Sequence, residues 1–462
     1  MSGTRGAAVS STEDSPAGSR FRFRWWHFAV LLLAIVVVFV LIRRWHWKRE
    51  FRQRIAAIAA AGYPATTEEL DAWYRWPAPG ENAAGWILDA GDRLTKPPQK
   101  DYDRLWTLIR YPGELPTGDP LSEDARQLMV RHVEANREAL QLLHEGATVE
   151  ESRYPIDLSD GFESLLPHLS VYRDAHYLLC FEALTCMEAG DPNGAARAIQ
   201  AALGVTHSLD HEPTVISQGV RLRSQVTILG ILERLLCRQT LAEPQLQALE
   251  TAVQDAYVPE ALKRALVGER CMIVHLFAVR QLPSSNLRWT SSMQAVLEVY
   301  SALGLTAREG TRLLDTAEEF IQALQLPPLR RQEAIERATL RLDACTKRSM
   351  MLFEYSHLSA VVAFEIEYIA SVRTALVALA AERFRLRPGR WPETLSELVP
   401  QYLPDVPDDP FDGAPLRYRC LEAGFAVYSV GEDRGDDGGR PLPPPKERQP
   451  GETYDITFAV RR

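Results

Sequence analysis

A short run of acids and glycines near the C-terminus is the part of this sequence best suited to chemistry. It reads YSVGEDRGDDGG, from Tyr428 to Gly439, and begins as an apolar stretch typical of a strand. Carboxylates are hard oxygen ligands that suit Ca²⁺, and glycines let backbone carbonyls turn toward an ion. A metal-binding loop, a piece of an active site and a solvated turn are the open interpretations. No nucleophile, histidine or basic residue is placed to work with these acids, which disfavours catalysis.

A second candidate for chemistry is a pair of residues with metal-ligand spacing. Glu354 and His357 form Glu-x-x-His, the motif by which helices present ligands to a di-iron centre. Such a centre needs a second copy of the motif and two further glutamates, and the sequence shows no second copy. Glu365 and Glu367 are near enough along the chain to join, but a charged helix face explains them equally well.

Two histidines form a third candidate. His207 and His211 stand four residues apart in HSLDHE, so a helix would place both imidazoles on one face. They precede Pro213 and have no third ligand in view, so we expect a capping or surface role. The sequence contains no phosphate loop, dinucleotide fingerprint, nucleophile elbow or HExxH motif.

The segments that must position these residues show mainly the hydrophobic periodicity of helices. We predict that residues 48–365 form a helical bundle or an irregular α-solenoid. One hairpin is well marked, because Gly190 ends a helix, Asp191 caps the next and Pro192 takes its first position. It resembles a tetratricopeptide hairpin, but the roughly 34-residue repeat does not recur. Thr66 or Thr67 is suited to cap an earlier helix.

The amino-acid composition changes near Arg387, where proline, glycine and aspartate become frequent. We predict a small α+β module over residues 366–462. Its apolar runs are short: PLRYRC and GFAVYSV are typical of paired strands, and YDITFAV of a third. The fold class is therefore mainly α with an α+β tail, and the acidic run follows the second strand of that tail.

An apolar segment near the N-terminus predicts a membrane anchor. Phe28 to Ile42 are fifteen consecutive apolar residues, flanked on each side by tryptophans where interfacial belts belong. We predict a transmembrane helix over residues 25–47, in contact with the lipid bilayer, after a disordered basic tail over residues 1–24. Arg43 and the residues after it do not suit a signal peptidase, so a cleaved signal peptide is disfavoured.

The charge is distributed unevenly. Residues 1–54 hold ten Lys/Arg and three Asp/Glu, and the whole chain has a net charge of −9, so the other 408 residues carry 16 net negative charges. Because binding of a polyanion needs clustered Lys/Arg, we expect no nucleic-acid partner. The six cysteines form no CxxC motif, and we expect buried thiols rather than disulfides.

The C-terminal module resembles that of the major pseudopilins of type II secretion. The resemblance covers residues 366–462 and rests on GRWPETLSELVPQYL, PDDPFDGAPLRY, VYSVGEDRGDDGG and YDI. In pseudopilins a long helix leads into a Gly-x-Tyr-Pro-x-Thr turn, a short helix, a Pro-x-Asp-Pro segment and a Ser-x-Gly-x-Asp-Gly loop. The whole chain also resembles uncharacterised bacterial single-pass membrane proteins that carry this tail. The resemblance implies a pseudopilin-like fold for the module.

The resemblance also implies a calcium site, because the pseudopilin loop after the serine-glycine turn binds Ca²⁺. Carried over by position, the carboxylate ligands are Asp433 and, more loosely, Asp436 and Asp437. Carbonyls near Val430 and Gly435 would complete the shell. The surrounding segment is rich in acids, so a cation would relieve local repulsion. A solvated acidic turn stays open as the alternative.

The chain departs from the pseudopilin pattern in three places. The acid spacing is not that of an EF-hand, and the insertion PLPPPKERQP separates the loop from Asp455. The prepilin processing signature is absent, since Gly18 is followed by SRFRF. A long helical region also separates the anchor from the module. Assembly into a pilus-like filament is therefore not expected.

These observations lead to one functional expectation and two alternatives. We expect a membrane-anchored, non-enzymatic scaffold or interaction protein with a protein partner and a calcium-stiffened tail. An enzyme with a site dispersed over the helical body, around Glu354 and His357, and a component related to type II secretion are the alternatives. Pseudopilin domains lie outside the cytoplasm, which favours an extracytoplasmic body, whereas the arginines after the anchor favour the opposite side.

Overall fold

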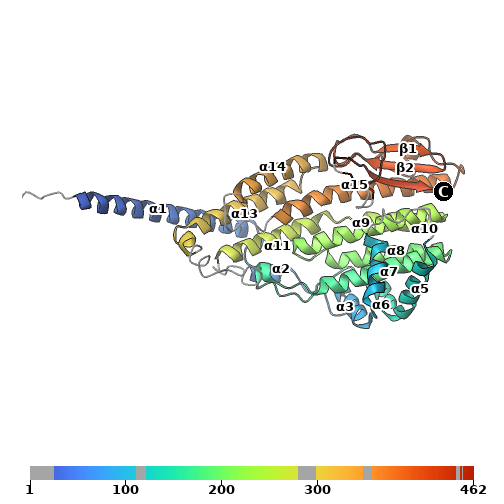
Figure 1. The fold of residues 1–462 in the computed structure, drawn as a ribbon, viewed down its shortest axis with the longest axis horizontal. Helices are drawn as coiled ribbons and strands as arrows, with labels where there is room; N and C mark the ends of the chain where they lie inside the picture. The colour runs from blue at the N-terminus through green and yellow to red at the C-terminus, as the bar shows by residue number, and fades with distance from the viewer. Residues whose placement is uncertain (1–24, 111–120, 279–297, 347–355, 444–447, 450) are drawn as a thin grey trace, which may run out of the picture.

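The computed structural model describes residues 25–110, 121–278, 298–346, 356–443, 448–449 and 451–462 (Figure 1). In this part of the chain the protein is mainly helical, with one three-stranded antiparallel sheet at the C-terminus. One apolar helix lies near the N-terminus. The predicted fold class is confirmed at this level.

The helices follow one another along most of the chain. The N-terminal half contains α1 (Trp25–Ala60), α2 (Thr67–Trp73), α3 (Ala83–Arg93), α4 (Gln99–Arg110), α5 (Glu123–Ala135), α6 (Arg137–Gly146), α7 (His168–Glu188) and α8 (Pro192–Thr206). The remainder contains α9 (Val215–Arg238), α10 (Glu243–Asp255), α11 (Pro259–Ala278), α13 (Leu305–Ala323), α14 (Pro328–Thr346) and α15 (Ser356–Arg385). Short 3₁₀ turns occur at η2 (Gly161–Glu163), η3 (His207–Leu209) and η4 (Leu395–Leu398).

Helix α1 is one continuous helix of 36 residues, about 54 Å long. An 18-residue window has a mean hydropathy of 2.7 and no buried residue, so this helix is long and apolar enough to cross a membrane. It continues beyond the predicted span of 25–47 to Ala60. Its last part packs on α13, where Phe51 is buried (Figure 1).

Local capping chemistry explains several helix boundaries. Thr66 is the N-cap of α2, because its side chain accepts a hydrogen bond from the Glu69 N–H. Gly190 ends α7 at φ +73°, a conformation that favours glycine. Asp191 then caps α8 by accepting a hydrogen bond from the Gly194 N–H at 2.9 Å. The predicted hairpin is therefore confirmed, and buried alanines let α7 and α8 pack closely.

The C-terminal sheet lies over α9 and α15. It consists of β1 (Arg417–Leu421), β2 (Gly424–Ser429) and β3 (Ile456–Arg461), with β2 in the centre. Both pairings are antiparallel, and a two-residue turn joins β1 to β2. Every residue of β2 is buried, because this strand lies between its two neighbours and Phe425 and Val427 pack in the hydrophobic core. The three predicted strands are confirmed.

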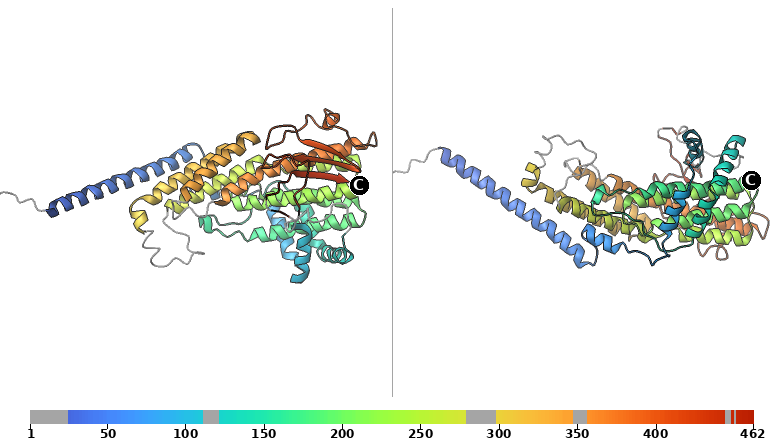
Figure 2. Two further views of the ribbon diagram at one scale, coloured as in Figure 1. Left: turned by 45° about the horizontal axis from the view of Figure 1, so that its top comes forward. Right: turned by 90° about the horizontal axis from the view of Figure 1, so that it is seen from below.

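The larger hydrophobic core runs through the predicted boundary at residue 366. Phe425 and Val460 of the sheet belong to the same core as Leu232 of α9 and Val377 of α15. A second core joins the end of α1 to α11, α13 and α14. Figure 2 shows the result from two further sides: α1 leaves one end of an elongated body, and the sheet lies toward the other end.

Candidate functional site

A buried carboxylate holds the start of the acidic loop in place. The Asp409 side chain is fully buried and comes from the PDDPFDG segment between α15 and β1. It accepts hydrogen bonds from the Ser429 hydroxyl at 2.8 Å, the Val430 N–H at 2.9 Å and the Phe411 N–H at 3.0 Å. Arg417 donates to it at 2.7 Å. Because both oxygens have partners, Asp409 is a structural anchor that fixes where the loop leaves β2.

The first two predicted ligands stabilise turns of the loop itself. An oxygen of Asp433 accepts a hydrogen bond from the Gly435 N–H at 2.9 Å. Asp436 accepts one from the Gly438 N–H at the same distance. Both carboxylates are exposed. This pattern, in which an aspartate bonds to the backbone two residues later, is that of Asx turns.

The third predicted ligand is in a different environment. One oxygen of Asp437 accepts a hydrogen bond from the Thr453 hydroxyl at 3.1 Å. Its other oxygen is buried and has no hydrogen-bond partner in the part of the chain that the structure describes. Such an oxygen costs about 1–3 kcal/mol if it stays without a donor or a cation. Of the carboxylate oxygens of the loop, it is the one best suited to bind a cation.

Asp455 closes the loop from the start of β3. This buried residue accepts hydrogen bonds from the Gly439 N–H at 2.6 Å and the Asp437 N–H at 3.4 Å. Burial raises the pKa of Asp455, and the nearby carboxylates of Asp437 and Asp436 raise it further. The insertion after the acidic run therefore does not carry Asp455 away from the loop.

The structure brings only part of the predicted set together. Asp436 and Asp437 are close enough to Asp455 to raise its pKa, while the Asp433 side chain is used in its own turn. Within the described residues, no three His, Cys, Asp or Glu side chains are grouped as a metal centre needs. The oxygen-rich chemistry nevertheless suits a hard cation, and Asp437 has an oxygen to offer.

Two of the candidate carboxylates of the helical body, Glu365 and Glu367, lie in the part of the chain that the structure describes. Glu365 forms a buried ion pair with Arg331 at 2.6 Å. Burial raises the pKa of Glu367, and Glu432 of the acidic loop adds to the rise. Glu354 and the side chain of His357 lie outside the described residues.

The two spaced histidines do not share a ligand position. His207 contacts Asp210 at 2.7 Å, and His211 contacts Arg264. His207 begins a 3₁₀ turn rather than sitting in a long helix, so the two rings are directed to different partners.

Sequence reasoning missed a buried polar layer between α7 and α9. The His168 imidazole contacts Glu212 at 2.9 Å, and the Ser217 hydroxyl donates to the same carboxylate. Nearby, Arg221 pairs with Asp210 at 2.8 Å and is almost fully buried. The only indication of this layer in the sequence is the segment DHEP, where an acid precedes a proline at the start of a helix. Because these groups are buried, we interpret them as structural contacts that hold the helices together.

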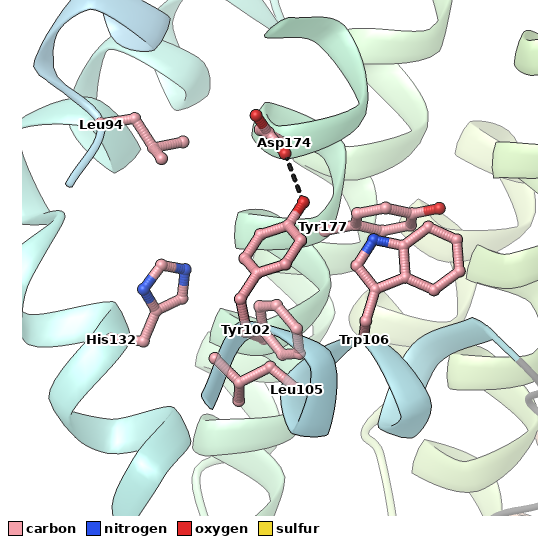
Figure 3. A pocket seen from close by; sticks show the side chains of 8 residues that line it. Leu94, Tyr102, Leu105, Trp106, His132, Asp174 and Tyr177 are labelled. Carbon is pink, nitrogen blue, oxygen red and sulfur yellow. Dashed lines mark hydrogen bonds between the residues drawn. The ribbon is translucent and has the colours of Figure 1, made fainter. Parts of the chain in front are cut away.

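One hollow lies between α4, α5 and α7 (Figure 3). Aromatic side chains line it, and the Tyr102 hydroxyl donates to Asp174 at 2.7 Å. Lys96 pairs with the other oxygen of Asp174 at 2.5 Å. Burial lowers the pKa of His132 on the opposite wall, so its ring is neutral at pH 7. The hollow has room for about one water molecule, and its polar groups tie α4 to α7.

No protein-family model, no curated protein and no solved structure matches this chain. The likeness of residues 366–462 to pseudopilins therefore remains an expectation that rests on their motifs.

Proposed function

We propose that this protein is a membrane-anchored, non-enzymatic scaffold that presents its C-terminal module to a protein partner outside the cytoplasm. The observation that carries the proposal is the construction of α1. Its first part exposes apolar side chains along its whole length, and its last part is built into the core of the body. Because one continuous helix forms both the span and part of the core, the position of the span fixes the position of the folded body.

Contacts along α1 support a fixed attachment. Phe51 is 6% exposed and lies 6.4 Å from the ring of Phe277, measured between ring centres. Arg54 pairs with Asp315 at 2.8 Å. Because packing and polar contacts both hold the helix, the body cannot swing freely about the anchor. The sheet then lies away from the anchor, where a partner can reach it (Figure 1).

The C-terminal module is itself bound firmly to the body. Arg462 donates to the Leu236 carbonyl at 2.7 Å and pairs with the buried Glu382 at 2.8 Å. The Ala459 N–H donates to Glu233 at 2.7 Å. A module held at its last residue is suited to present its loops in one orientation.

Calcium binding by the acidic loop is part of the proposal. The buried oxygen of Asp437, which has no hydrogen-bond partner among the described residues, supports it, as do the Asp436 and Asp437 carboxylates that raise the pKa of Asp455. A bound Ca²⁺ would supply a positive charge that lets these acids stay ionised in a partly buried loop. The ion would thereby stiffen the loop that faces a partner.

A labelling experiment tests the anchor and the side of the membrane together. Cys420 is exposed on β1, whereas Cys180, Cys237 and Cys271 are buried. We expect the full chain to remain with membranes after alkaline carbonate extraction. We also expect a membrane-impermeant maleimide to label a Cys186→Ser, Cys345→Ser chain in spheroplasts, and further Cys420→Ser to remove that labelling.

Two outcomes would count against the proposal. Release of the chain by carbonate would show that α1 does not span the bilayer. Labelling that requires lysis of the spheroplasts would place the module in the cytoplasm. A cytoplasmic protein with a known accessible thiol serves as the control for spheroplast integrity.

A further inference from the structure

We propose that the body touches the membrane a second time, through a tip at residues 299–304, and that exposed arginines of α1 at the same height bind anionic phospholipid headgroups. This inference rests on the proposed membrane span of α1. It adds a lipid-facing surface on the body, about 260 residues along the chain from the anchor, and it names the class of lipid.

The height of the tip follows from its contact with α1. The Arg44 guanidinium donates to the Ala302 carbonyl at 3.2 Å. Gly304 lies against the backbone of Arg44, since a Cβ built on it would be 2.9 Å from the Arg44 Cα. Gly304 also has φ +79°, so a larger side chain would be strained there. The tip is therefore level with Arg44.

Arg44 lies two residues after Ile42, the last residue of the exposed apolar run. The polar zone of a bilayer is about 5–8 Å thick on each side, and a helix rises about 1.5 Å per residue. Residues 43–47 consequently fall in the headgroup zone when the apolar run spans the core. The tip of the body falls in the same zone.

The tip is apolar where it would meet that zone. Val299 is 59% exposed and Leu303 is 38% exposed. Exposed apolar side chains at interface height gain stabilisation from shallow insertion, which an aqueous surface would not give them. The transmembrane segment and the tip then form one continuous lipid-facing surface.

Exposed basic groups lie on α1 on both sides of the row that packs on the body. Trp47, Phe51 and Ile55, spaced by four residues, pack toward the body. Arg43 and Arg49 are exposed, and the Arg49 side chain reaches back to the level of Trp45, within the headgroup zone. The Arg43 guanidinium lies 4.5 Å from the centre of the Trp47 ring, and that of Arg49 lies 5.3 Å from the centre of the Trp45 ring.

Aromatic stacking leaves the edges of these guanidinium groups able to donate to phosphate oxygens. Glu50 is the acid on the same segment, and it lies 3.9 Å from His46. Because residues 55–462 are net negative, an anionic membrane would otherwise repel the body. The arginines offset that repulsion at the point of attachment.

Quenching of a fluorescent label by spin-labelled lipids tests the tip contact. The full chain, with Cys420→Ser, is placed in nanodiscs with one new cysteine at a time: Val36→Cys, Leu303→Cys or Glu422→Cys. We expect deep spin labels to quench at Val36, shallow spin labels to quench at Leu303, and neither to quench at Glu422. The Glu422 position is exposed in the β1–β2 turn and serves as the control.

The outcomes separate the inference from the proposal beneath it. No quenching at Val36 would overturn the membrane span. Quenching at Val36 without quenching at Leu303 would leave the span standing and overturn the tip contact.

Lipid composition tests the role of the arginines. We expect quenching at Leu303 to be about twofold stronger in phosphatidylglycerol than in phosphatidylcholine nanodiscs. Combined Arg43→Gln and Arg49→Gln should remove this difference. Arg137→Gln, an exposed arginine on α6, should leave it unchanged. Equal quenching of the unaltered chain in both lipids would overturn the assignment of anionic headgroups.

Discussion

At the scale of single residues, the C-terminal module uses its carboxylates in two ways. Asp409 is buried with donors on both oxygens, so its charge is balanced inside the protein. Asp437 has one buried oxygen without a partner among the described residues, and its neighbours Asp436 and Asp455 are also acids. A structural role explains Asp409 completely. A structural role does not explain the buried oxygen of Asp437, which a positive charge would stabilise.

Calcium should therefore stabilise the protein through Asp437. We expect millimolar Ca²⁺ to raise the melting temperature of the detergent-solubilised chain, because a ligand that binds only the folded state stabilises it by mass action. Asp437→Asn should abolish the rise. Asp433→Asn should retain most of it, since the Asp433 carboxylate serves its own turn. Differential scanning fluorimetry over a range of Ca²⁺ concentrations measures this.

Glu422→Gln is the matched control, because Glu422 is an exposed acid of the same sheet. The full Ca²⁺ response should survive in this variant. If Asp433→Asn rather than Asp437→Asn removes the response, the ligand set implied by the pseudopilin resemblance holds and the geometric choice of Asp437 fails. If Ca²⁺ causes no shift in the unaltered chain, the loop is a solvated turn.

At the scale of elements, sequence reasoning succeeded where the cause is local. Thr66 and Asp191 cap helices with their own side chains, and Gly190 supplies a positive φ, so each boundary depends on a few adjacent residues. Asp455 could not be predicted in the loop, because pairing of β2 with β3 brings it there. The docking of α1 on α13 was missed for the same reason: it depends on packing between distant segments.

The contact between α9 and β3 gives a pH prediction. Burial raises the pKa of Glu233 from its usual 4.5 to about 7. The folded state then binds more protons than the unfolded state between these values, so the free energy of unfolding should fall as pH rises through that window. A shift of this size corresponds to up to about 3 kcal/mol. Glu233→Gln should remove this fall, since Gln can still accept from the Ala459 N–H.

Urea unfolding at pH 5 and pH 7.5 measures the effect. The unaltered chain and the Glu422→Gln control should both lose stability between the two values, and Glu233→Gln should lose less. An identical pH dependence in Glu233→Gln and in the unaltered chain would show that Glu233 does not titrate in this window.

At the scale of the whole molecule, the chain separates three properties along its length. The apolar run lies at one end, the acidic helical body follows, and the sheet with its acidic loop lies toward the other end (Figure 2). The last part of α1 joins the apolar run to the folded body. Its ion pair between Arg54 and Asp315 is largely exposed and contributes little stability, so packing must supply most of the attachment.

The packing of α1 predicts how the body responds to truncation. Phe51 is buried in the second core, and Ile55 and Ile58 pack against it. A Cβ on Gly310 would lie 2.8 Å from the Phe51 ring, which shows how closely α13 approaches. A fragment of residues 62–462 loses all of these contacts, whereas a fragment of residues 48–462 keeps them. Loss of the Phe51 side chain alone typically costs about 3–5 kcal/mol.

We therefore expect the 62–462 fragment to unfold at a markedly lower urea concentration than the 48–462 fragment and to bind more of a dye that reports exposed apolar surface. Phe51→Ala in the longer fragment should reproduce part of the loss, and Arg52→Gln, an exposed neighbour on the same helix, should not. Equal midpoints for the two fragments would mean that α1 is a tether rather than part of the body. A free tether could not hold the tip at Val299 and Leu303 at a fixed height above the bilayer, so the same measurement bears on the membrane contact.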